Sequence, residues 1–289
     1  MKINKIFEKK NTTLSFEIFP PKRDGDIKTI YNTLDELAVL KPDYMSVTYG
    51  AAGSEKGDKT IKIASVIKNK YQIEALAHLT CVGATSKEIS EILNRFRNEN
   101  IENILALRGD IPIGKENEKR EFGYASDLIK YIKKNNDFTV GGACYPEPHI
   151  ESKSRISDII NLKKKVDNGA DFLVTQLFFD NNYYYDFMKD IRSIDINVPV
   201  TVGIMPAINK RQIERMVTMC GTTLPVKFKK IFDKYEDNPE ALKDAGIAYA
   251  SEQIIDLISS GVDGIHLYVM NKPEIAKRLV KNIGGILKA

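Results

Sequence analysis

LSFEIFPPK, residues 14–22, begins with the first of eight short apolar segments that alternate with longer segments of helical periodicity. The eight segments are expected strands and span residues 14–19, 44–48, 73–80, 103–107, 138–144, 172–177, 200–204 and 264–269. Parallel neighbours need a crossover connection, so strands that alternate with helices predict a parallel α/β sheet. Eight repeats favour closure into a single (β/α)8 TIM barrel.

The intervening segments carry helix signals. In SKEISEILNRFRNEN, which begins at Ser86, the apolar residues share one helical face, and Thr85 with Glu88 forms a capping box at its start. Apolar residues mark further helices before the sixth strand (Ile156, Ile159, Ile160, Val166) and before the eighth strand (Ile254, Ile255, Leu257, Ile258). These segments predict the outer ring of helices.

The rival fold is an open nucleotide-binding sheet, which carries Gly-x-Gly-x-x-Gly after its first strand. Here Phe19-Pro20-Pro21-Lys22 follows instead and cannot form that turn. No linker of Gly, Ser or Pro composition is present, so residues 1–289 are expected to form one domain. Residues 221–240 lengthen the last repeat and are expected to be an inserted helix and loop before the last barrel helix.

Composition narrows the class of protein. The 289 residues include 43 basic and 39 acidic ones, a balance that argues against nucleic acid as the main partner. Three separated cysteines suit a reducing compartment, and no apolar run is long enough for a membrane span or a signal peptide. The chain is therefore expected to be cytoplasmic, with no membrane partner.

Glu17 is the most informative single residue. Ser15, Glu17 and Phe19 point to one side of their strand and Leu14, Phe16 and Ile18 to the other, and both sides of a barrel strand are buried. Burial against apolar neighbours favours the protonated form of a carboxyl group, which is the form a general acid needs. A buried glutamate that holds a backbone amide or an arginine is an equally good interpretation of the strand alone.

Other strand ends also carry chemistry-bearing groups. Arg108-Gly109-Asp110 follows the fourth strand, where Asp110 would stabilise a developing cation or simply pair with Arg108 in a surface turn. His78 lies inside a strand and is either core or site, whereas His266 is interpreted as plain core. No zinc-ligand spacing is present, so no metal is expected. Asp158, Asn161 and Lys165 share a helical face that would bind a phosphate or ribose, or be solvated.

Taken together, the strand-end motifs resemble those of the methylenetetrahydrofolate reductase family, in its short bacterial form without the C-terminal regulatory domain. The matching pieces are SFEIFPPK, KPDYMSVTYGA, AHLTC, ALRGD, YASDLI, YPEPH, NLKKKVDNGADFLVTQLFFD and GIMP. They run in the family's order from Ser15 to about Lys272. Each piece is weak by itself, but eight in order at compatible spacing are specific.

The resemblance implies bound FAD, a reduced nicotinamide (NADH or NADPH) as donor, and conversion of 5,10-methylenetetrahydrofolate to 5-methyltetrahydrofolate by ping-pong hydride transfer. By motif position, the residues implied to line FAD are Thr48, His78, Arg108, Gly109, Asp110, Tyr124, Ala125, Ala143, Tyr145 and His149. Those implied to reach its ribose and diphosphate are Asp158, Asn161, Lys164 and Lys165. The resemblance thus favours ligand binding over solvation for that helical face.

The resemblance also implies roles at the substrate. Glu17 and Asp110 would be catalytic: Glu17 would protonate the bridged folate so that its ring opens to an iminium cation, and Asp110 would stabilise that cation. Glu17, Asp110, Gln176, Gln212 and Lys272 would meet the folate or the nicotinamide. Gln176 offers both a donor and an acceptor to the pterin edge.

Two residues depart from the family pattern. Met216 stands where a phenylalanine packs against both ligands, and methionine cannot stack as a ring does. Lys272 stands where an arginine follows the eighth strand; lysine keeps the charge but loses the bidentate fork. Both changes touch ligand recognition rather than the acid, so the electron donor is the least determined part of the assignment.

Alternative functions remain open from the sequence. One is a barrel methyltransferase that handles methyl-folate without a flavin. Another is a flavin reductase subunit fed by an electron-donor partner protein instead of NAD(P)H, and a third is a non-catalytic folate binder. Because barrel enzymes often assemble, a homo-oligomer is also an expectation, although no particular patch supports it.

Overall fold

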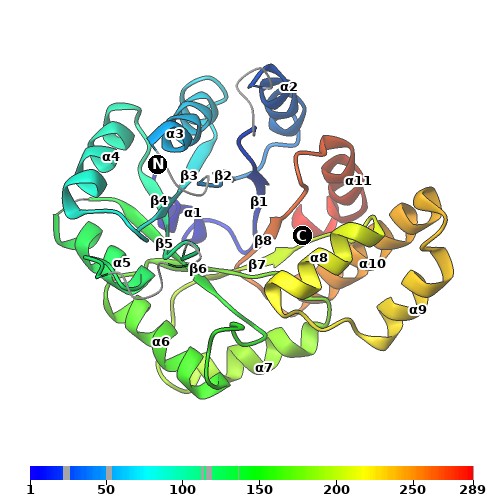
Figure 1. Cartoon of the computed structure of the whole chain (residues 1–289). Coiled ribbons are helices and arrows are strands. Elements are labelled where there is room, and N and C mark those ends of the chain that lie inside the picture. The colour runs from blue at the N-terminus through cyan, green and yellow to red at the C-terminus, as the bar shows by residue number, and fades with distance from the viewer. Residues whose placement is uncertain (22–26, 50–53, 112–113, 115–118, 136, 289) are drawn as a thin grey trace.

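The computed structural model describes residues 1–21, 27–49, 54–111, 114, 119–135 and 137–288. Its eight strands pair in chain order, all parallel, and close into a barrel between the first and the last (Figure 1). The strands are β1 (Thr13–Ile18), β2 (Tyr44–Val47), β3 (Glu74–Thr80), β4 (Asn103–Leu107), β5 (Thr139–Cys144), β6 (Phe172–Thr175), β7 (Val200–Ile204) and β8 (Gly264–Leu267). The (β/α)8 barrel prediction is confirmed, with each strand in its expected segment.

Helices surround the barrel as an outer ring (Figure 1). The helices of the described residues are α1 (Asn4–Phe7), α2 (Ile27–Ala38), α3 (Ser54–Asn69), α4 (Ser86–Asn98), α5 (Ala125–Asn135), α6 (Arg155–Asp167), α7 (Asn181–Arg192), α8 (Lys210–Cys220), α9 (Val226–Tyr235), α10 (Pro239–Ser259) and α11 (Pro273–Ile283), followed by the short 3-10 turn η2 (Ile286–Lys288). Of these, α1 and α8 lie at the ends of the barrel rather than in the ring. In the part of the chain that the model describes, no helix is both long and apolar enough to cross a membrane.

The main core lies between the strands and the helical ring. Phe16 and Ile18 on β1 are fully buried in it, together with inward residues of α2 and α4 such as Leu34 and Phe96. Burying a side chain of this size contributes roughly 1.5–3 kcal/mol. This packing decides which face of β1 looks outward, and it leaves the alternate residues Ser15 and Glu17 to point into the barrel.

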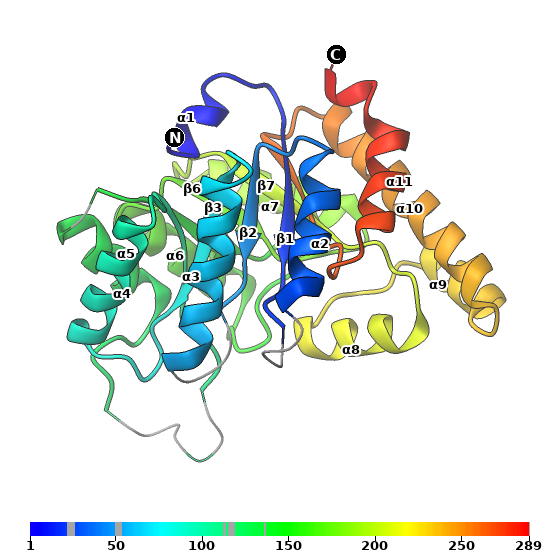
Figure 2. The same cartoon turned by 90° about the horizontal axis from the view of Figure 1, so that it is seen from above.

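A second apolar cluster closes the N-terminal end of the barrel interior. Ile3 and Ile6 from the α1 segment pack there with side chains from the strands: Tyr44, Leu76, Leu105, Phe172 and Val174. The backbone N–H of Ile3 donates to Oδ1 of buried Asn103 at 2.7 Å, which fixes the segment to β4. Figure 2 shows α1 at one end of the barrel and α8 at the other.

Local signals behave as expected with one exception. Thr85 and Glu88 form both hydrogen bonds of the capping box at the start of α4, as predicted. On α6, however, Ile156 and Ile160 are 72% and 51% exposed, so only Leu162 of that helix is fully buried. The helix was predicted correctly, but two of its five apolar residues face outward.

Residues 221–240 hold α9 and the turns on either side of it, next to α10 at the edge of the molecule (Figure 1). Phe228 anchors α9 by stacking on Phe179 from the loop after β6, with ring centroids 5.3 Å apart. The segment thus contains the expected helix. Its status as an insertion before the last barrel helix stays a prediction, as does the single domain over residues 1–289.

Candidate functional site

The C-terminal ends of the strands meet at the barrel mouth, where parallel barrels carry their active sites. Most of the predicted site residues lie on these ends or in the loops directly after them, as the strand bounds show. Four further ones, Asp158, Asn161, Lys164 and Lys165, lie on α6, and Gln212 lies on α8. The last residues of two matching motifs, Lys22 of SFEIFPPK and Gly50–Ala51 of KPDYMSVTYGA, fall outside the described residues.

Glu17 points into the barrel, and its side chain is about nine-tenths buried, as expected for either side of a barrel strand. Its surroundings differ from the apolar ones that we expected. The carboxyl Oε2 lies 3.6 Å from Nε2 of His78 on β3 and 3.7 Å from Nε2 of His266 on β8. Both separations exceed hydrogen-bond length, so the three groups are close neighbours rather than an ion-paired set.

His266 was expected to be plain core; it is buried, as expected, but its surroundings are polar. The ring is buried, but both of its nitrogens face polar groups: Nδ1 lies 2.8 Å from Oγ of Ser15, and Nε2 lies 3.3 Å from Oγ of Ser46. The β1–β8 register places His266 beside Ser15, two residues before Glu17. His266, the third residue of the four in β8, therefore lies near the acid on the neighbouring strand.

Tyr268, directly after β8, faces the same space. Its hydroxyl donates to the carbonyl of Thr175 at 2.8 Å, and its ring meets the His266 ring edge to face. Burial first, and then the nearby charge of Glu17, raise the pKa of this phenol well above its ordinary value. Tyr268 is therefore a neutral hydrogen-bond donor near neutral pH, and it was not predicted from the sequence.

The Arg108-Gly109-Asp110 turn does not form the surface Arg–Asp pair that the triplet alone favours. Arg108 makes a bidentate ion pair with Glu151 in the loop after β5, at 2.6 and 2.9 Å, which raises the pKa of the guanidinium. Gly109 has φ +85°, and a Cβ there would lie 2.9 Å from Val82. Only glycine fits this turn without strain. Asp110 is left exposed at the mouth.

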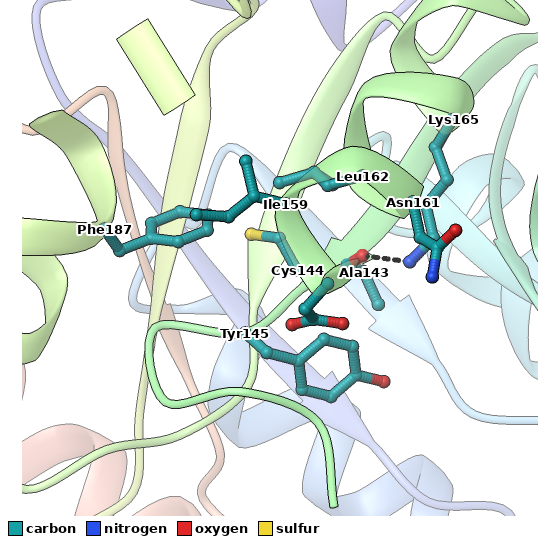
Figure 3. A pocket seen from close by; sticks show the side chains of 9 residues that line it. Ala143, Cys144, Tyr145, Ile159, Asn161, Leu162, Lys165 and Phe187 are labelled. Carbon is teal, nitrogen blue, oxygen red and sulfur yellow. Dashed lines mark hydrogen bonds between the residues drawn. The ribbon is translucent and has the colours of Figure 1, made fainter. Parts of the chain in front are cut away.

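A cavity lies between the end of β5 and α6 (Figure 3). Five of its lining residues are ones that the family resemblance assigns to FAD: Ala143, Tyr145, Asp158, Asn161 and Lys165. Cys144, Ile159, Leu162 and Phe187 complete the lining. The predicted ribose and diphosphate face of α6 is therefore not a simple solvated surface.

Lys165 is the positive group of this cavity. Its Nζ donates to the carbonyl of Ala143 at 2.7 Å and lies 5.7 Å from the ring centre of Tyr145 (Figure 3). Burial lowers the pKa of this amine and raises the pKa of the Tyr145 hydroxyl. A half-buried cation with donor capacity left over suits a phosphate group, whereas Lys164 is exposed and bonds to Asn161.

The remaining residues assigned to FAD are His149, Tyr124, Ala125 and Thr48. The His149 ring meets the Tyr145 ring edge to face, with centroids 4.7 Å apart, and the backbone N–H of His149 donates to Oδ2 of Asp158 at 3.3 Å. Tyr124 is 65% exposed just before α5, and Ala125 begins that helix and is buried. Thr48 is half-buried at the end of β2, on the strand next to Glu17.

The residues assigned to substrate lie further round the mouth. Gln176 follows β6, and its Oε1 accepts from the N–H of Leu177 at 2.8 Å. Gln212 on α8 donates to the sulfur of Met205 at 3.4 Å, and Lys272 precedes α11. Met216 packs against the apolar cluster of Leu177, Phe179, Met205, Ala207, Ile213 and Phe228 beside Gln212.

Asn271, which holds the loop after β8 against the end of β1, was not singled out from the sequence. Asn271 brackets the backbone of Phe19: its Oδ1 accepts from the Phe19 N–H at 2.9 Å, and its Nδ2 donates to the Phe19 carbonyl at 2.8 Å. Met270 and Asn271 both have positive φ, at 52° and 55°. Two consecutive left-handed residues are strained, and an asparagine in such a loop is a signal that could have drawn attention to it.

Metal binding has no candidate in the described ranges, because no group of three or more His, Cys, Asp or Glu side chains gathers as a metal site would need. The chemistry of the mouth is instead that of a buried carboxyl group, two imidazoles, a phenol and a lysine-lined cavity.

Solved structures share this fold. A Clostridium thermocellum protein, described as uncharacterized and as binding two copies of 5-methyl-5,6,7,8-tetrahydrofolic acid, superposes with a TM-score of 0.69 at 15% identity and covers 100% of this chain and 99% of that one. A dihydropteroate synthase from Coxiella burnetii gives 0.53 at 12% identity, over 96% and 94% of the two chains. At such identities the likeness concerns the fold alone.

Curated relatives are closer in sequence. The 5,10-methylenetetrahydrofolate reductase of Escherichia coli (strain K12) is 38% identical over 271 residues, which cover 94% of this chain and 90% of that enzyme. Methylenetetrahydrofolate reductase (NADH) 1 of Arabidopsis thaliana is 37% identical over 99% of this chain, which spans 50% of the plant protein.

The family model of methylenetetrahydrofolate reductase matches residues 2–284, nearly the whole chain. The barrel fold and the order of the strand-end motifs agree with that match. This chain belongs to the methylenetetrahydrofolate reductase family of oxidoreductases.

Proposed function

We propose that this protein is a flavin-dependent reductase that converts 5,10-methylenetetrahydrofolate to 5-methyltetrahydrofolate. The observation that carries the proposal is the buried Glu17 carboxyl group at the barrel mouth, flanked by His78 and His266, in a chain of this family. A mere folate binder has no use for a carboxyl group held in this environment, whereas a reaction that must protonate a folate nitrogen needs one.

The β5–α6 cavity fits FAD in the character of its donors. Lys165 supplies a cation for the diphosphate, Asp158 and Asn161 supply polar groups for a ribose, and Tyr145 supplies an aromatic wall. Arg108 and Thr48 would extend this surface toward Glu17. When bound, FAD would take two electrons from a reduced nicotinamide and give them to the folate.

The protein's own side chains then have separate tasks. Glu17 would give its proton to the bridged folate, so that the five-membered ring opens to an iminium cation. Asp110, exposed at the mouth, would place negative charge near that cation and lower its energy. Gln176 has its Oε1 turned to the Leu177 N–H, which leaves its amide N–H groups to orient the pterin.

The electron donor is the part where this chain departs from its family. Met216 offers an apolar but non-aromatic surface beside Gln212, which is a weaker platform for a nicotinamide ring than phenylalanine. The experiment therefore compares three electron donors: NADH, NADPH and an electron-donor partner protein. The name of the Arabidopsis relative specifies NADH, and we take NADH as the first donor to try.

The test is an anaerobic titration of the purified protein loaded with FAD. Reduction of the flavin by NADH, by NADPH and by a low-potential electron carrier is followed by absorbance, and 5,10-methylenetetrahydrofolate is then added to the reduced protein. We expect the folate to reoxidise the flavin and to yield 5-methyltetrahydrofolate in equal amount.

Two results would contradict the proposal. Protein that stays colourless after FAD is added would favour the flavin-free methyltransferase alternative. Reduced flavin that methylenetetrahydrofolate does not reoxidise would show that the barrel binds the cofactor for another reaction. A flavin that only the low-potential carrier reduces would leave the folate chemistry intact and assign the donor to a partner protein.

A further inference from the structure

The Glu17 carboxyl group lies between the imidazole rings of His78 and His266. Its Oε2 is 3.6 Å from Nε2 of His78 and 3.7 Å from Nε2 of His266. Burial lowers the pKa of His78 to about 4, so that ring is neutral near pH 7. Within the described residues, Nε2 of His78 is buried without a hydrogen-bond partner.

His266 is held more firmly than His78. Ser15 and Ser46 contact its two nitrogens at 2.8 and 3.3 Å, and the Tyr44 ring stacks on it with an interplanar angle of 13°. The ring therefore cannot swing away from the acid without breaking two hydrogen bonds, which is the kind of support that fixes a functional group in place.

The contacts of Ser15 indicate which nitrogen of His266 carries the proton. The Ser15 hydroxyl also lies 3.3 Å from the carbonyl of Ile265, which can only accept. A hydroxyl that donates to this carbonyl must accept from Nδ1–H of His266. Nε2 is then an acceptor, and its single lone pair is directed toward the Ser46 hydroxyl and the Glu17 carboxyl group.

An acceptor next to a carboxyl group discriminates between its two protonation states. The lone pair of Nε2 repels an ionised carboxylate but accepts a hydrogen bond from a carboxylic acid. Hydrogen bonding to the neutral form favours that form. The two separations are within about 1 Å of hydrogen-bond length, a distance that a rotation of the carboxyl group can close.

We propose that His266 is a positioning residue that holds Glu17 in its protonated form, through an Nε2 acceptor that Ser15 fixes and for which Ser46 competes. This inference rests on the proposed function, in which Glu17 is the acid. In the step that it serves, the O–H bond of Glu17 breaks and the folate nitrogen gains the proton. Glu17 becomes a carboxylate, no proton passes to His266, and a proton from solvent restores the acid.

Burial keeps two of the groups around Glu17 in a single protonation state near neutral pH. Among the described residues, the titratable side chains that face it are His78 from β3, His266 from β8 and Tyr268 directly after β8. Burial keeps His78 neutral, and burial keeps the phenol of Tyr268 protonated. From β2, the contact in this layer is the uncharged hydroxyl of Ser46. His266 is thus the neighbour through which a substitution should alter the acid.

The decisive variant is His266→Asn. The asparagine amide can take the place of Nδ1 beside Ser15 but puts nothing at Nε2. We expect the rate of the folate half-reaction to fall about tenfold at neutral pH, because the midpoint of its pH profile moves down by about one unit. KM for the folate and the reduction of the flavin by the donor should stay near the wild-type values. His266→Gln, whose longer amide reaches the Nε2 position, should recover most of the rate.

Ser46→Ala gives a change of opposite sign. Without the competing hydroxyl, the Nε2 lone pair is free for Glu17, and the midpoint should move up. Thr201→Val is the matched control in the same interior: it removes the hydroxyl that contacts Tyr44 at 3.3 Å and should lower stability without moving the midpoint.

The outcomes separate this inference from the proposed function. If Glu17→Gln still reduces the folate, the acid is elsewhere and the proposed function loses its catalyst. If Glu17→Gln is inactive but His266→Asn keeps the wild-type pH profile, or loses both half-reactions in parallel, His266 is structural and the inference is wrong. Should His266→Asn fail to fold, the direction of the Ser46→Ala shift decides: upward supports the inference, and no shift or a downward one overturns it.

Discussion

The two ends of the barrel interior are built from the same strands but from opposite kinds of residue. At the N-terminal end, Leu76, Leu105 and Phe172 pack with Ile3 and Ile6 into an apolar plug. Toward the C-terminal end, the interior positions hold hydroxyl, imidazole and carboxyl groups: Ser15, Glu17, Ser46, His78 and His266. The change occurs within two residues along a strand, from Leu76 to His78 on β3 and from Tyr44 to Ser46 on β2.

This contrast teaches that stability and chemistry are divided along the barrel axis. The plug gains free energy by removing apolar surface from water, and no polar side chain there needs a ligand. The mouth holds buried polar groups that are satisfied by one another or left, as with His78, without a partner. Variants at the plug should therefore change stability, and variants at the mouth should change rate or pH dependence.

The largest expected effect is on catalysis. Glu17→Gln should slow the folate half-reaction about 10²–10⁴-fold, the usual contribution of a general acid, while flavin reduction and the urea midpoint change little. The two half-reactions are measured separately by rapid mixing. Glu74→Gln is the matched control from the other end of the barrel, where Glu74 pairs with Lys68 at 2.8 Å. A similar rate loss in that variant would argue against the division.

Phe172→Ala should give the largest loss of stability, about 3–5 kcal/mol, because it empties a fully buried ring position in the plug. The measurement is the midpoint and slope of urea unfolding. Ile160→Ala, at an exposed position of α6, should change the free energy of unfolding by no more than about 0.5 kcal/mol. If the remaining folded Phe172→Ala protein showed a displaced pH profile, the plug would be coupled to the acid.

The pH dependence of the free energy of unfolding should reveal the titration of His78 at the barrel mouth. Because burial lowers the pKa of His78 from 6.5 to about 4, the unfolded chain binds a proton more readily than the folded one across that window. The stability that neutral His78 contributes is full above about pH 6.5 and is lost as the pH falls toward 4. The loss amounts to roughly 3 kcal/mol. His78→Asn should flatten this part of a plot of unfolding free energy against pH; an unchanged slope would assign it to other groups.

The smallest expected effect concerns the loop after β8. Asn271→Ala should lower the free energy of unfolding by about 1–2 kcal/mol, because it removes both hydrogen bonds to Phe19 and leaves a β-carbon residue at positive φ. Asn271→Gly loses the same bonds without the backbone strain, so it should be less destabilised. Equal losses in the two variants would show that backbone strain plays no part.

Much of the fold was predictable because strand segments can be recognised from their local sequence. Each apolar run such as Asn103–Leu107 is bounded by polar or turn residues, and the helix periodicity between runs requires parallel pairing. The placement of Glu17 on the face of its strand opposite Phe16 and Ile18 was predictable for the same reason, since alternation along a strand is a local property. The α1 plug was not predicted, because a helix of four residues has no period to detect.

The site was predicted less completely, and the misses share a cause. His266 was assigned to the core from its place early in the expected strand 264–269; its burial was predicted, but its contact with Ser15, which the β1–β8 register creates, was not. Arg108 was considered with Asp110, two residues away, whereas its partner is Glu151, 43 residues away. Sequence spacing does not encode the register of a closed barrel or the meeting of two loops. The roles of the site residues stay predictions that the variants above address.

The bracket that Asn271 forms around Phe19 has a consequence for the order in which the protein folds. It joins two residues 252 apart in the chain, and the contacts of Ser15 with His266 span 251. Closing a loop of that length costs entropy before any contact compensates for it, so contacts at the β1–β8 seam should form late. A chain whose other seven strand pairs have already formed would then hold Glu17 on an unpaired edge. The closing of the barrel and the assembly of the acid's surroundings would be a single event.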